Sequence, residues 1–573
     1  MRRLAVVFAI AFFAATAALA QSADSQFQKL LDDEWEWTVR EFPTQATRVG
    51  DNRYNDRMPD FSGEAIERRR AHARELVGRV RAIDRTKLSP ANRLNYDLYL
   101  LDAEQDVEGQ RFRSDFIQLT QRGGVHSQLA NLAQSVPKAN ARDYENFIKR
   151  LGEAPRLVDQ SIAQMRKGLA AGITPPRITL RDAAELIGNQ IHDDPTKTPI
   201  YQQMFSSGSA DERVRVQAAE VIRTKVTPAF RRLQRFFTEE YYPKTREAVG
   251  LSAVPDGRDW YAYLVRNFTT TNMTPDEIHN LGLSEVKRIR GEMEKVREST
   301  GFKGSLAEFF TFLRTDPRFY FTEKEALLKE YRDIAKRADP ELTKLFGTLP
   351  RLPYGIVPVP AYAEKTATTA YYSSGSLEAG RPGLYYANTY NLPARPKWEM
   401  EALTLHEAVP GHHLQLAIQQ ELGELPKFRR FGGYTAFIEG WGLYAESLGP
   451  EMGFYKDPYS KFGQLTYEMW RAIRLVVDTG MHSKGWSRQR AIDFFRENAG
   501  KTEHDIVVEI DRYINSPGQA LAYKIGELKF KELRALATRE LGDRFDIRRF
   551  HDAVLGAGAL PLSVLETQIR EWI

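Results

Sequence analysis

The chain of 573 residues contains no cysteine. Disulfide bonds, thiolate metal ligands and a cysteine nucleophile are therefore excluded, and we expect no lipid attached at a cysteine. Beyond the first 20 residues, no stretch reaches about 18 uninterrupted apolar residues, the length that a membrane-spanning helix needs. Stability must come from a packed core, for which an apolar content of 42% is ample.

A strong charge of either sign is also missing. The sequence has 81 Lys and Arg against 76 Asp and Glu, a net charge of +5. This falls to +3 without residues 1–20, which contain Arg2 and Arg3. No basic block stands out, so we expect no nucleic-acid partner. The sequence also lacks repeats of fixed period and low-complexity segments.

Residues 1–20 have the pattern of a secretory signal peptide. Arg2 and Arg3 give the positive start, residues 4–18 form the apolar run, and a small-x-small cleavage site ends at Ala20. The alternative is an uncleaved N-terminal anchor. We predict an exported protein, periplasmic or secreted, with no stable membrane insertion after cleavage.

Helical periodicity dominates the chain up to about residue 340. Apolar residues at three- and four-residue spacing predict helices over 25–40, 63–83, 89–108, 143–171, 211–245 and 323–338. We expect a bend in the fifth of these at Pro228, and a further helix starting after Thr274. Short strands are predicted near 354–360, 369–375 and 383–389. The fold class is therefore mainly α with a small sheet.

Histidines are scarce, yet three of the ten fall within residues 406–413. Histidine is the commonest side-chain ligand of zinc, and His406 is followed directly by Glu407. A Glu after a ligand His is the general base of the His-Glu-x-x-His motif of zinc peptidases. In that motif the second His comes four residues after the first, but here that position is Pro410.

The spacing of these histidines does not fit a straight helix. His412 would point about 120° away from His406, and His413 would lie about 10.5 Å further along the axis. Two nitrogens on one zinc lie only roughly 3–3.5 Å apart. Pro410 cannot continue the helical hydrogen bonds, and Gly411 is free to take unusual angles. We therefore expect a bulge that returns His412 to the metal, with His413 as the alternative.

An acidic helix over residues 437–446 offers a third ligand. Glu439 lies 33 residues after His406, which leaves room for a turn and an antiparallel return past the metal. Glu446 is the rival, and we expect it to be a group behind the ligands or an ordinary ion-pair residue. The alternative to the whole site is a kinked core helix with surface histidines.

Three segments resemble the bacterial domain of unknown function 885 family, which is grouped by similarity with the gluzincin metallopeptidases. They are residues 406–415, residues 437–446 and the run PGQALAYKIG at 517–526. The start of the chain around Trp35-Glu36-Trp37 is also similar. The resemblance implies a large helical zincin-like domain with a small antiparallel sheet beside the metal-binding helix. Residues 21–350 would form one side of a cleft and 351–573 the metal-site catalytic region, as one continuous fold.

The resemblance also implies roles for single residues. Zinc held by two His and one Glu keeps a position for water, and Glu407 would take its proton. Tyr523 is the first candidate to stabilise the oxyanion, ahead of Tyr513 and His482. The strand at 383–389 would be an edge strand that pairs with substrate.

Three residues are candidates for contacts with the substrate. Tyr386 and Asn388 would form its wall, although an ordinary hairpin behind the metal helix is the alternative. Gln519 follows a Pro-Gly break that is expected to line the cavity.

Together these features predict an exported zinc metallopeptidase that hydrolyses short peptides. One alternative is a zinc amidohydrolase acting on a non-peptide or cell-wall amide. The other is a non-enzymatic periplasmic binding or scaffold protein with a structural metal, against which Glu407 argues, because such a site has no use for a base. Oligomeric state and the choice between exo- and endo-cleavage are not indicated.

Overall fold

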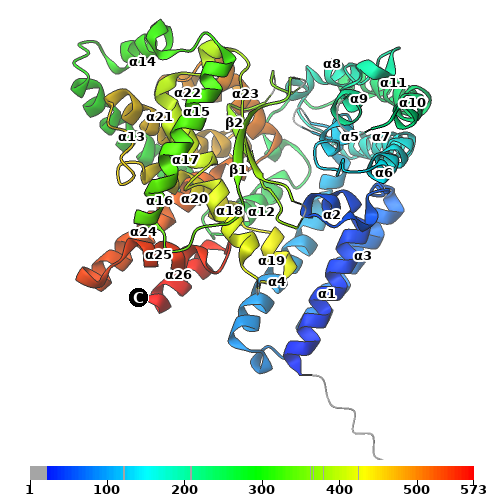
Figure 1. Cartoon of the computed structure of the whole chain (residues 1–573), viewed down its shortest axis with the longest axis horizontal. Coiled ribbons are helices and arrows are strands. Elements are labelled where there is room, and N and C mark those ends of the chain that lie inside the picture. Colours follow the sequence, from blue (N-terminus) through cyan, green and yellow to red (C-terminus); the bar gives the residue numbers. More distant parts are fainter. Residues whose placement is uncertain are drawn as a thin grey trace, which may run out of the picture.

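The computed structural model describes residues 22–573, apart from residues 121–122, 207–209, 362, 366, 379 and 424. The predicted signal peptide at 1–20 lies outside the described residues. The described chain is mainly helical with one small sheet, as the sequence predicts (Figure 1). None of its helices combines the length and the apolar character that crossing a membrane requires.

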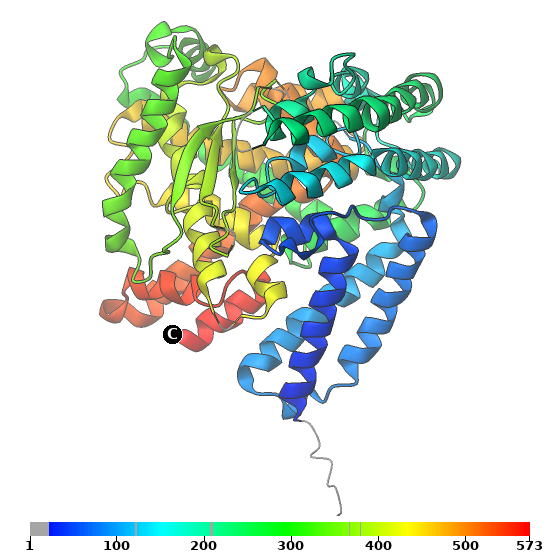
Figure 2. The ribbon, with the colours of Figure 1, turned by 45° about the vertical axis from the view of Figure 1, so that its right-hand side comes forward.

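The N-terminal part consists of two groups of helices (Figure 2). The first comprises α1 (Ala23–Glu41), α2 (Pro43–Val49), α3 (Gly63–Arg81) and α4 (Pro90–Gly109). The second comprises α5 (Gln128–Leu132), α6 (Ala141–Gly152), α7 (Ala154–Ala171), α8 (Ala183–Gly188), α9 (Pro199–Met204), α10 (Glu212–Val221) and α11 (Thr227–Phe236). The helix predicted over 143–171 is broken at Glu153, because Pro155 cannot continue it. The helix predicted over 211–245 contains a π-helical segment, Ile222–Val226, shortly before Pro228, which is the second residue of α11.

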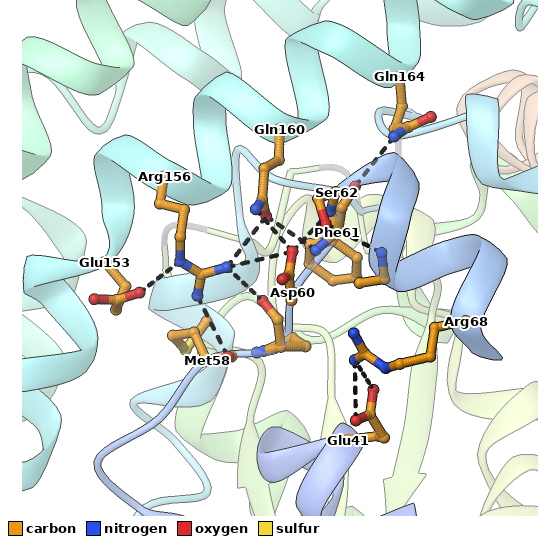
Figure 3. Close-up of polar contacts among 12 residues, drawn as sticks. Glu41, Met58, Asp60, Phe61, Ser62, Arg68, Glu153, Arg156, Gln160 and Gln164 are labelled. Atoms are coloured by element: carbon orange, nitrogen blue, oxygen red, sulfur yellow. Dashed lines mark hydrogen bonds and ion pairs between the residues drawn. The ribbon is translucent and has the colours of Figure 1, made fainter.

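The loop before α3 fixes the first group onto α7 (Figure 3). Arg156 donates hydrogen bonds to the carbonyls of Met58 and Pro59, at 3.4 and 3.3 Å. Gln160 accepts from the Phe61 amide at 2.9 Å and donates to Asp60 at 2.8 Å. Backbone groups of the loop are thereby satisfied by side chains of one helix, which joins the two groups.

The rest of the chain surrounds one long buried helix, α21 (Pro458–His482). Before it come α12 (Gly257–Thr269), α13 (Pro275–Ser299), α14 (Leu306–Thr315), α15 (Lys324–Ala338), α16 (Leu342–Leu345), α17 (Met400–Glu407), α18 (His412–Glu421), α19 (Lys427–Phe431) and α20 (Thr435–Ser447). After it come α22 (Arg488–Asn498), α23 (Glu503–Asn515), α24 (Ala522–Leu541), α25 (Ile547–Leu555) and α26 (Leu562–Trp572). Thr274 and Glu277 form a capping box at the start of α13, where the sequence predicts a helix to begin.

The sheet is mixed, and this corrects the antiparallel sheet expected from the sequence. Its strands are β1 (Tyr354–Pro358), β2 (Ala370–Ser373) and β3 (Gly383–Ala387), in the order β1-β3-β2. β3 is antiparallel to β2 but parallel to β1. The reason is the path of the chain, because β2 and β3 form a hairpin while β1 joins the far side of β3. β3 is therefore the central strand, and β2 is an edge strand, which pairs with no other described strand.

Candidate metal centre

The two histidines of the motif lie on either side of a break between α17 and α18. α17 ends at Glu407, the Val409–Pro410 peptide bond is cis, and α18 begins at His412. A Cβ at Gly411 would lie 1.9 Å from the carbonyl oxygen of His406, so this position requires glycine. Trp441 of α20 donates a hydrogen bond to the Pro410 carbonyl at 2.8 Å. The break expected from Pro410 and Gly411 is thus present and is packed against α20.

Three side chains converge at this break, namely His406, His412 and Glu439. Glu439 Oε2 lies 3.3 Å from His412 Nε2 and 3.8 Å from His406 Nε2. The three potential ligand atoms all lie within 4.8 Å of one another. The two imidazole rings are nearly perpendicular, at 83°, with centroids 4.6 Å apart. The structure therefore brings together the three residues that the sequence predicts as metal ligands.

His413, the alternative second ligand, points to the sheet instead. The Tyr372 hydroxyl donates to His413 Nδ1 at 2.9 Å, and the His413 ring packs on Tyr354 with centroids 4.5 Å apart. Burial lowers the pKa of His413 to about 4, so the ring is neutral and can accept that hydrogen bond. His413 fastens α18 to strands β1 and β2.

Glu446, the rival of Glu439, lies behind the ligands. His406 Nδ1 donates to Glu446 Oε1 at 2.8 Å, and Arg471 Nη2 lies 3.3 Å from the same oxygen. The Glu446 side chain is fully buried. A carboxylate on the second nitrogen of a ligand His fixes the tautomer and turns the other nitrogen toward the metal. Glu446 matches the role behind the ligands that the sequence assigns to it.

The electrostatics of the site favour a cation where the three ligand atoms meet. Burial acts to lower the pKa of His406, but hydrogen bonds to Glu439 and Glu446 outweigh it and raise that pKa to about 9. Burial acts to raise the pKa of Glu439, but hydrogen bonds from His406 and His412 hold it well below its usual range. A proton and a metal ion would compete for the same place.

The residues present fit a metal ion. Glu439 Oε2 is buried without a well-aligned hydrogen-bond donor, which is costly for a carboxylate unless a cation lies beside it. A Cβ at position 442 would lie only 2.8–3.1 Å from three atoms of the His406 ring. Because Gly442 has no Cβ, the ring can keep its position. Two imidazole nitrogens and one carboxylate oxygen are a donor set that suits zinc.

Glu407 lies beside this group in the wall of a cavity of about 390 Å³. Its side chain is buried, and it makes no hydrogen bond or ion pair with any residue that the structure describes. All residues that line the cavity lie between 368 and 523. The N-terminal side of the cleft, expected from residues 21–350, is not part of this cavity and stays a prediction.

Tyr523 shares the cavity with the metal ligands, as do Tyr371, Tyr372 and Tyr467. Its ring is nearly parallel to that of His406, at 13°, with centroids 6.3 Å apart. Burial, followed by the charge of Glu439, raises the pKa of Tyr523, so its hydroxyl stays protonated and can donate.

The two weaker candidates for that role have their polar groups occupied. The Tyr513 hydroxyl accepts hydrogen bonds from Trp470 and Arg474, both at 2.8 Å. His482 accepts from the Leu251 amide and donates to the Tyr513 carbonyl, both at 3.0 Å. Neither residue lines the cavity.

The expected substrate contacts are corrected in part. Gln519 lines the cavity and accepts a hydrogen bond from Arg512 at 2.9 Å. Asn388 and Tyr386 do not line it. Asn388 instead donates to three carbonyls of the loop before β2, and Tyr386 stacks on Tyr371 with centroids 4.8 Å apart.

The edge strand is also a different one from that expected. β3 is paired on both sides, so its backbone cannot accept a further strand. Residues 368–372, which include the start of β2, line the cavity consecutively. The edge strand next to the metal ligands is therefore β2. The order of the strands decides this, and that order is not visible in the sequence.

Several charged residues of the cavity were missed by the sequence analysis. Arg471 and Arg474 come from α21, and Glu509 and Arg512 from α23. The available signal was two arginines three residues apart between apolar residues of the predicted helix 464–477, where they share one face. Charged residues in such a helix need partners, and these come from a distant helix.

The comparisons with solved structures show two proteins of the same fold. A protein from Colwellia psychrerythraea, provisionally described as a lipoprotein, is 28% identical, with a TM-score of 0.89 over 96% of this chain and 99% of that one. A protein from Shewanella oneidensis, provisionally described as a lipoprotein of unknown function, is 15% identical, with a TM-score of 0.66 over 96% and 100%. A Pyrococcus furiosus carboxypeptidase reaches a TM-score of only 0.37 at 12% identity, which supports no inference.

No curated protein matches the sequence. The family model described as bacterial protein of unknown function (DUF885) matches residues 43–569, which is most of the chain. The protein therefore belongs to the DUF885 family.

Proposed function

We propose that this protein is a gluzincin-like zinc metallopeptidase that hydrolyses short peptides. The observation that carries the proposal is the convergence of His406, His412 and Glu439 on one wall of a cavity, next to an unpaired, buried Glu407. A purely structural metal site would not need a carboxylate without partners beside it. This observation favours an enzyme over a binding or scaffold protein.

His406, His412 and Glu439 would hold the zinc. A zinc ion in such a site supplies a charge that polarises a carbonyl and lowers the pKa of a water. Glu446 holds the His406 ring in place through the 2.8 Å hydrogen bond to Nδ1. Gly442 lets α20 approach that ring closely enough for Glu439 to reach the same point.

The chain's own residues then move the proton and bind the substrate. Glu407 would accept a proton from the attacking water and donate it to the leaving amine. Tyr523 would donate a hydrogen bond to the carbonyl oxygen of the scissile bond as negative charge develops there. These two residues lie on the same cavity as the three proposed ligands.

The outer edge of β2 would bind the substrate backbone. A peptide that adds to this edge gains main-chain hydrogen bonds beside residues 368–372. A cavity of about 390 Å³ has the size of a small-molecule site, so it admits a few residues and excludes folded proteins. We therefore expect short, unfolded peptides as substrates.

Export is part of the proposal. The signal-peptide pattern at residues 1–20 supports export, and the enzyme would then act in the periplasm or outside the cell. Mass spectrometry of the exported protein should find an N-terminus at or near Gln21. A mature chain that still begins at Met1 would contradict cleavage.

A peptide library tests the activity directly. Zinc-loaded protein should release new amino termini from the library, chelator should abolish this, and added zinc should restore it. Cleavage of cell-wall or other amides with no cleavage of peptides would favour the amidohydrolase. Zinc bound at one per chain with no hydrolysis of either class would favour the binding or scaffold protein.

A further inference from the structure

Three arginines share the cavity with the proposed metal ligands. They are Arg471 and Arg474 of α21 and Arg512 of α23. Their exposed fractions are only 4%, 4% and 6%. A guanidinium cannot lose its proton in a protein, so each buried arginine needs an anion close by.

Only one carboxylate pairs with two of these cations. Arg471 is paired with Glu446, at 3.3 Å. Arg474 and Arg512 both rely on Glu509, whose Oε2 lies 3.2 Å from each. Glu407 and Glu439 also line the cavity, but neither forms an ion pair with these two arginines, and Glu439 lies at the proposed metal site. Two buried cations thus share one ion-pair partner, so one positive charge has none of its own.

Arg474 also has an unused donor. It donates to Tyr513 and Glu509, but its Nη1 is buried and has no hydrogen-bond partner. Arg512 donates to Glu509 and Gln519, and its Nη2 lies 3.2 Å from the same Glu509 oxygen. Buried donors are almost always satisfied in folded proteins, so a ligand that accepts hydrogen bonds would suit the place beside Arg474.

Arg474 lies close to the metal site. The Tyr523 ring is 4.3 Å from the Arg474 guanidinium carbon and 6.3 Å, centroid to centroid, from the His406 ring. Arg474 is therefore at most about 11 Å from that ring, the sum of the two distances. An extended peptide advances roughly 3.3–3.6 Å per residue, so this gap holds three residues at most.

We propose that Arg474 and Arg512 bind the C-terminal carboxylate of the substrate, so that cleavage falls within its last three residues. The proposal rests on the peptidase function above and makes the enzyme an exopeptidase acting at the C-terminus. A planar carboxylate can accept a hydrogen bond from the unused Arg474 donor and supplies a second anion to the two guanidinium groups. Arg471 has a different role, because Glu446 already compensates it and links it to His406.

Binding can be measured without turnover in zinc-loaded Glu407→Gln protein. The probes are one neutral peptide with a free C-terminus, the same peptide as its C-terminal amide, and an amide with Asp as its last residue. Hydrogen bonds to a charged group are worth roughly 1.5–3 kcal/mol, so the free acid should bind about 10- to 100-fold more tightly than the neutral amide. An Asp amide that binds as tightly as the free acid would overturn the assignment to the C-terminus.

Arg474→Gln should remove most of this preference, and Arg474→Lys should restore part of it. Removal of Arg474 leaves Glu509 and Arg512 as a balanced pair, so the fold has a reason to tolerate the change. Arg570→Gln, at an exposed position of α26, is the matched control and should keep the full preference. A preference that survives in Arg474→Gln would overturn the proposal.

The comparison of acid with amide also stands without the variants. Equal binding of the two peptides by protein with Arg474 intact would overturn the proposal even if the variants fail to fold. Because binding is the readout, absence of hydrolysis by the wild type would refute the peptidase function while leaving the carboxylate subsite measured. If both proposals hold, the wild type should release fragments of one to three residues from the C-terminus of the free acid only.

Discussion

Gly442→Ala should weaken metal binding although it replaces none of the proposed ligands. The new methyl group would lie 2.8 Å from His406 Cε1, 2.9 Å from Nε2 and 3.1 Å from Nδ1. Contacts this short are not tolerated, so either the ring or α20 must shift. The ring is held on its other nitrogen by Glu446, and α20 carries Glu439. Either shift therefore changes the geometry of the three ligands.

The magnitude follows from two opposing effects. Alanine in place of glycine inside a helix stabilises by about 1 kcal/mol, while overpacking of a buried site costs about 1–3 kcal/mol. The metal-free Gly442→Ala protein should thus range from equally stable to about 2 kcal/mol less stable. Disturbing the groups that orient a ligand typically lowers metal affinity by about 10- to 100-fold, and we expect a loss of that size for zinc.

Competition for zinc with a chromophoric chelator measures this affinity, and Gly291→Ala is the matched control. Gly291 also lies inside a helix, α13, but a Cβ there would meet nothing within 4 Å. Gly291→Ala should therefore gain up to about 1 kcal/mol in the free energy of unfolding and keep its zinc affinity. Gly442→Ala protein that binds zinc as tightly as this control would refute the proposed geometry.

Three further changes test separate parts of the site and the fold. His412→Ala should lose bound zinc whereas His413→Ala keeps it, as measured by elemental analysis, because His413 points to the sheet. Tyr523→Phe should lower kcat by about 10²–10³-fold, the usual effect of one oxyanion donor, with zinc content unchanged. Burial lowers the pKa of His551 from its ordinary value of 6.5 to about 3. Above pH 6.5 the ring is neutral in both the folded and the unfolded protein, and the fold keeps its full stability. This stability is lost as the pH falls from 6.5 towards 3, by up to about 1.4 kcal/mol per pH unit, and denaturant unfolding should show a smaller slope for His551→Gln.

Each of these changes has a result that would contradict its premise. Equal zinc in wild type and His412→Ala would remove that residue from the ligand set. Full activity of Tyr523→Phe would leave the hydroxyl without a role in the reaction. An unchanged pH dependence in His551→Gln would mean that this histidine does not oppose acid unfolding.

The sequence predicted those features that depend on neighbouring residues. Apolar spacing located most helices, and the Thr274 cap marked the start of α13. The break at Pro410 and Gly411 followed from the missing amide and the missing Cβ, and it favoured His412 over His413, which stayed open as the alternative. The number of residues between His406 and Glu439 was enough to predict a second helix that returns past the metal site.

The features that the sequence did not predict depend on distant segments. Whether β3 is an edge or a central strand is decided by where β1 joins the sheet, and no pattern within 383–389 records that. Asn388 looked like a wall residue, but its amide is used by carbonyls of the preceding loop. The pairing of Arg474 and Arg512 with the single carboxylate of Glu509 became visible only when α21 and α23 were placed side by side.

The most direct test of the proposed mechanism is the rate of peptide hydrolysis by Glu407→Gln at full zinc occupancy. Glutamine keeps the size of the side chain but cannot accept the proton, so zinc content should be normal and kcat should fall about 10²–10⁴-fold. Glu497→Gln, at an exposed position of α22, should cleave at the wild-type rate. A zinc-loaded Glu407→Gln protein that retains more than roughly a tenth of the wild-type rate would contradict the assignment of Glu407 as the base.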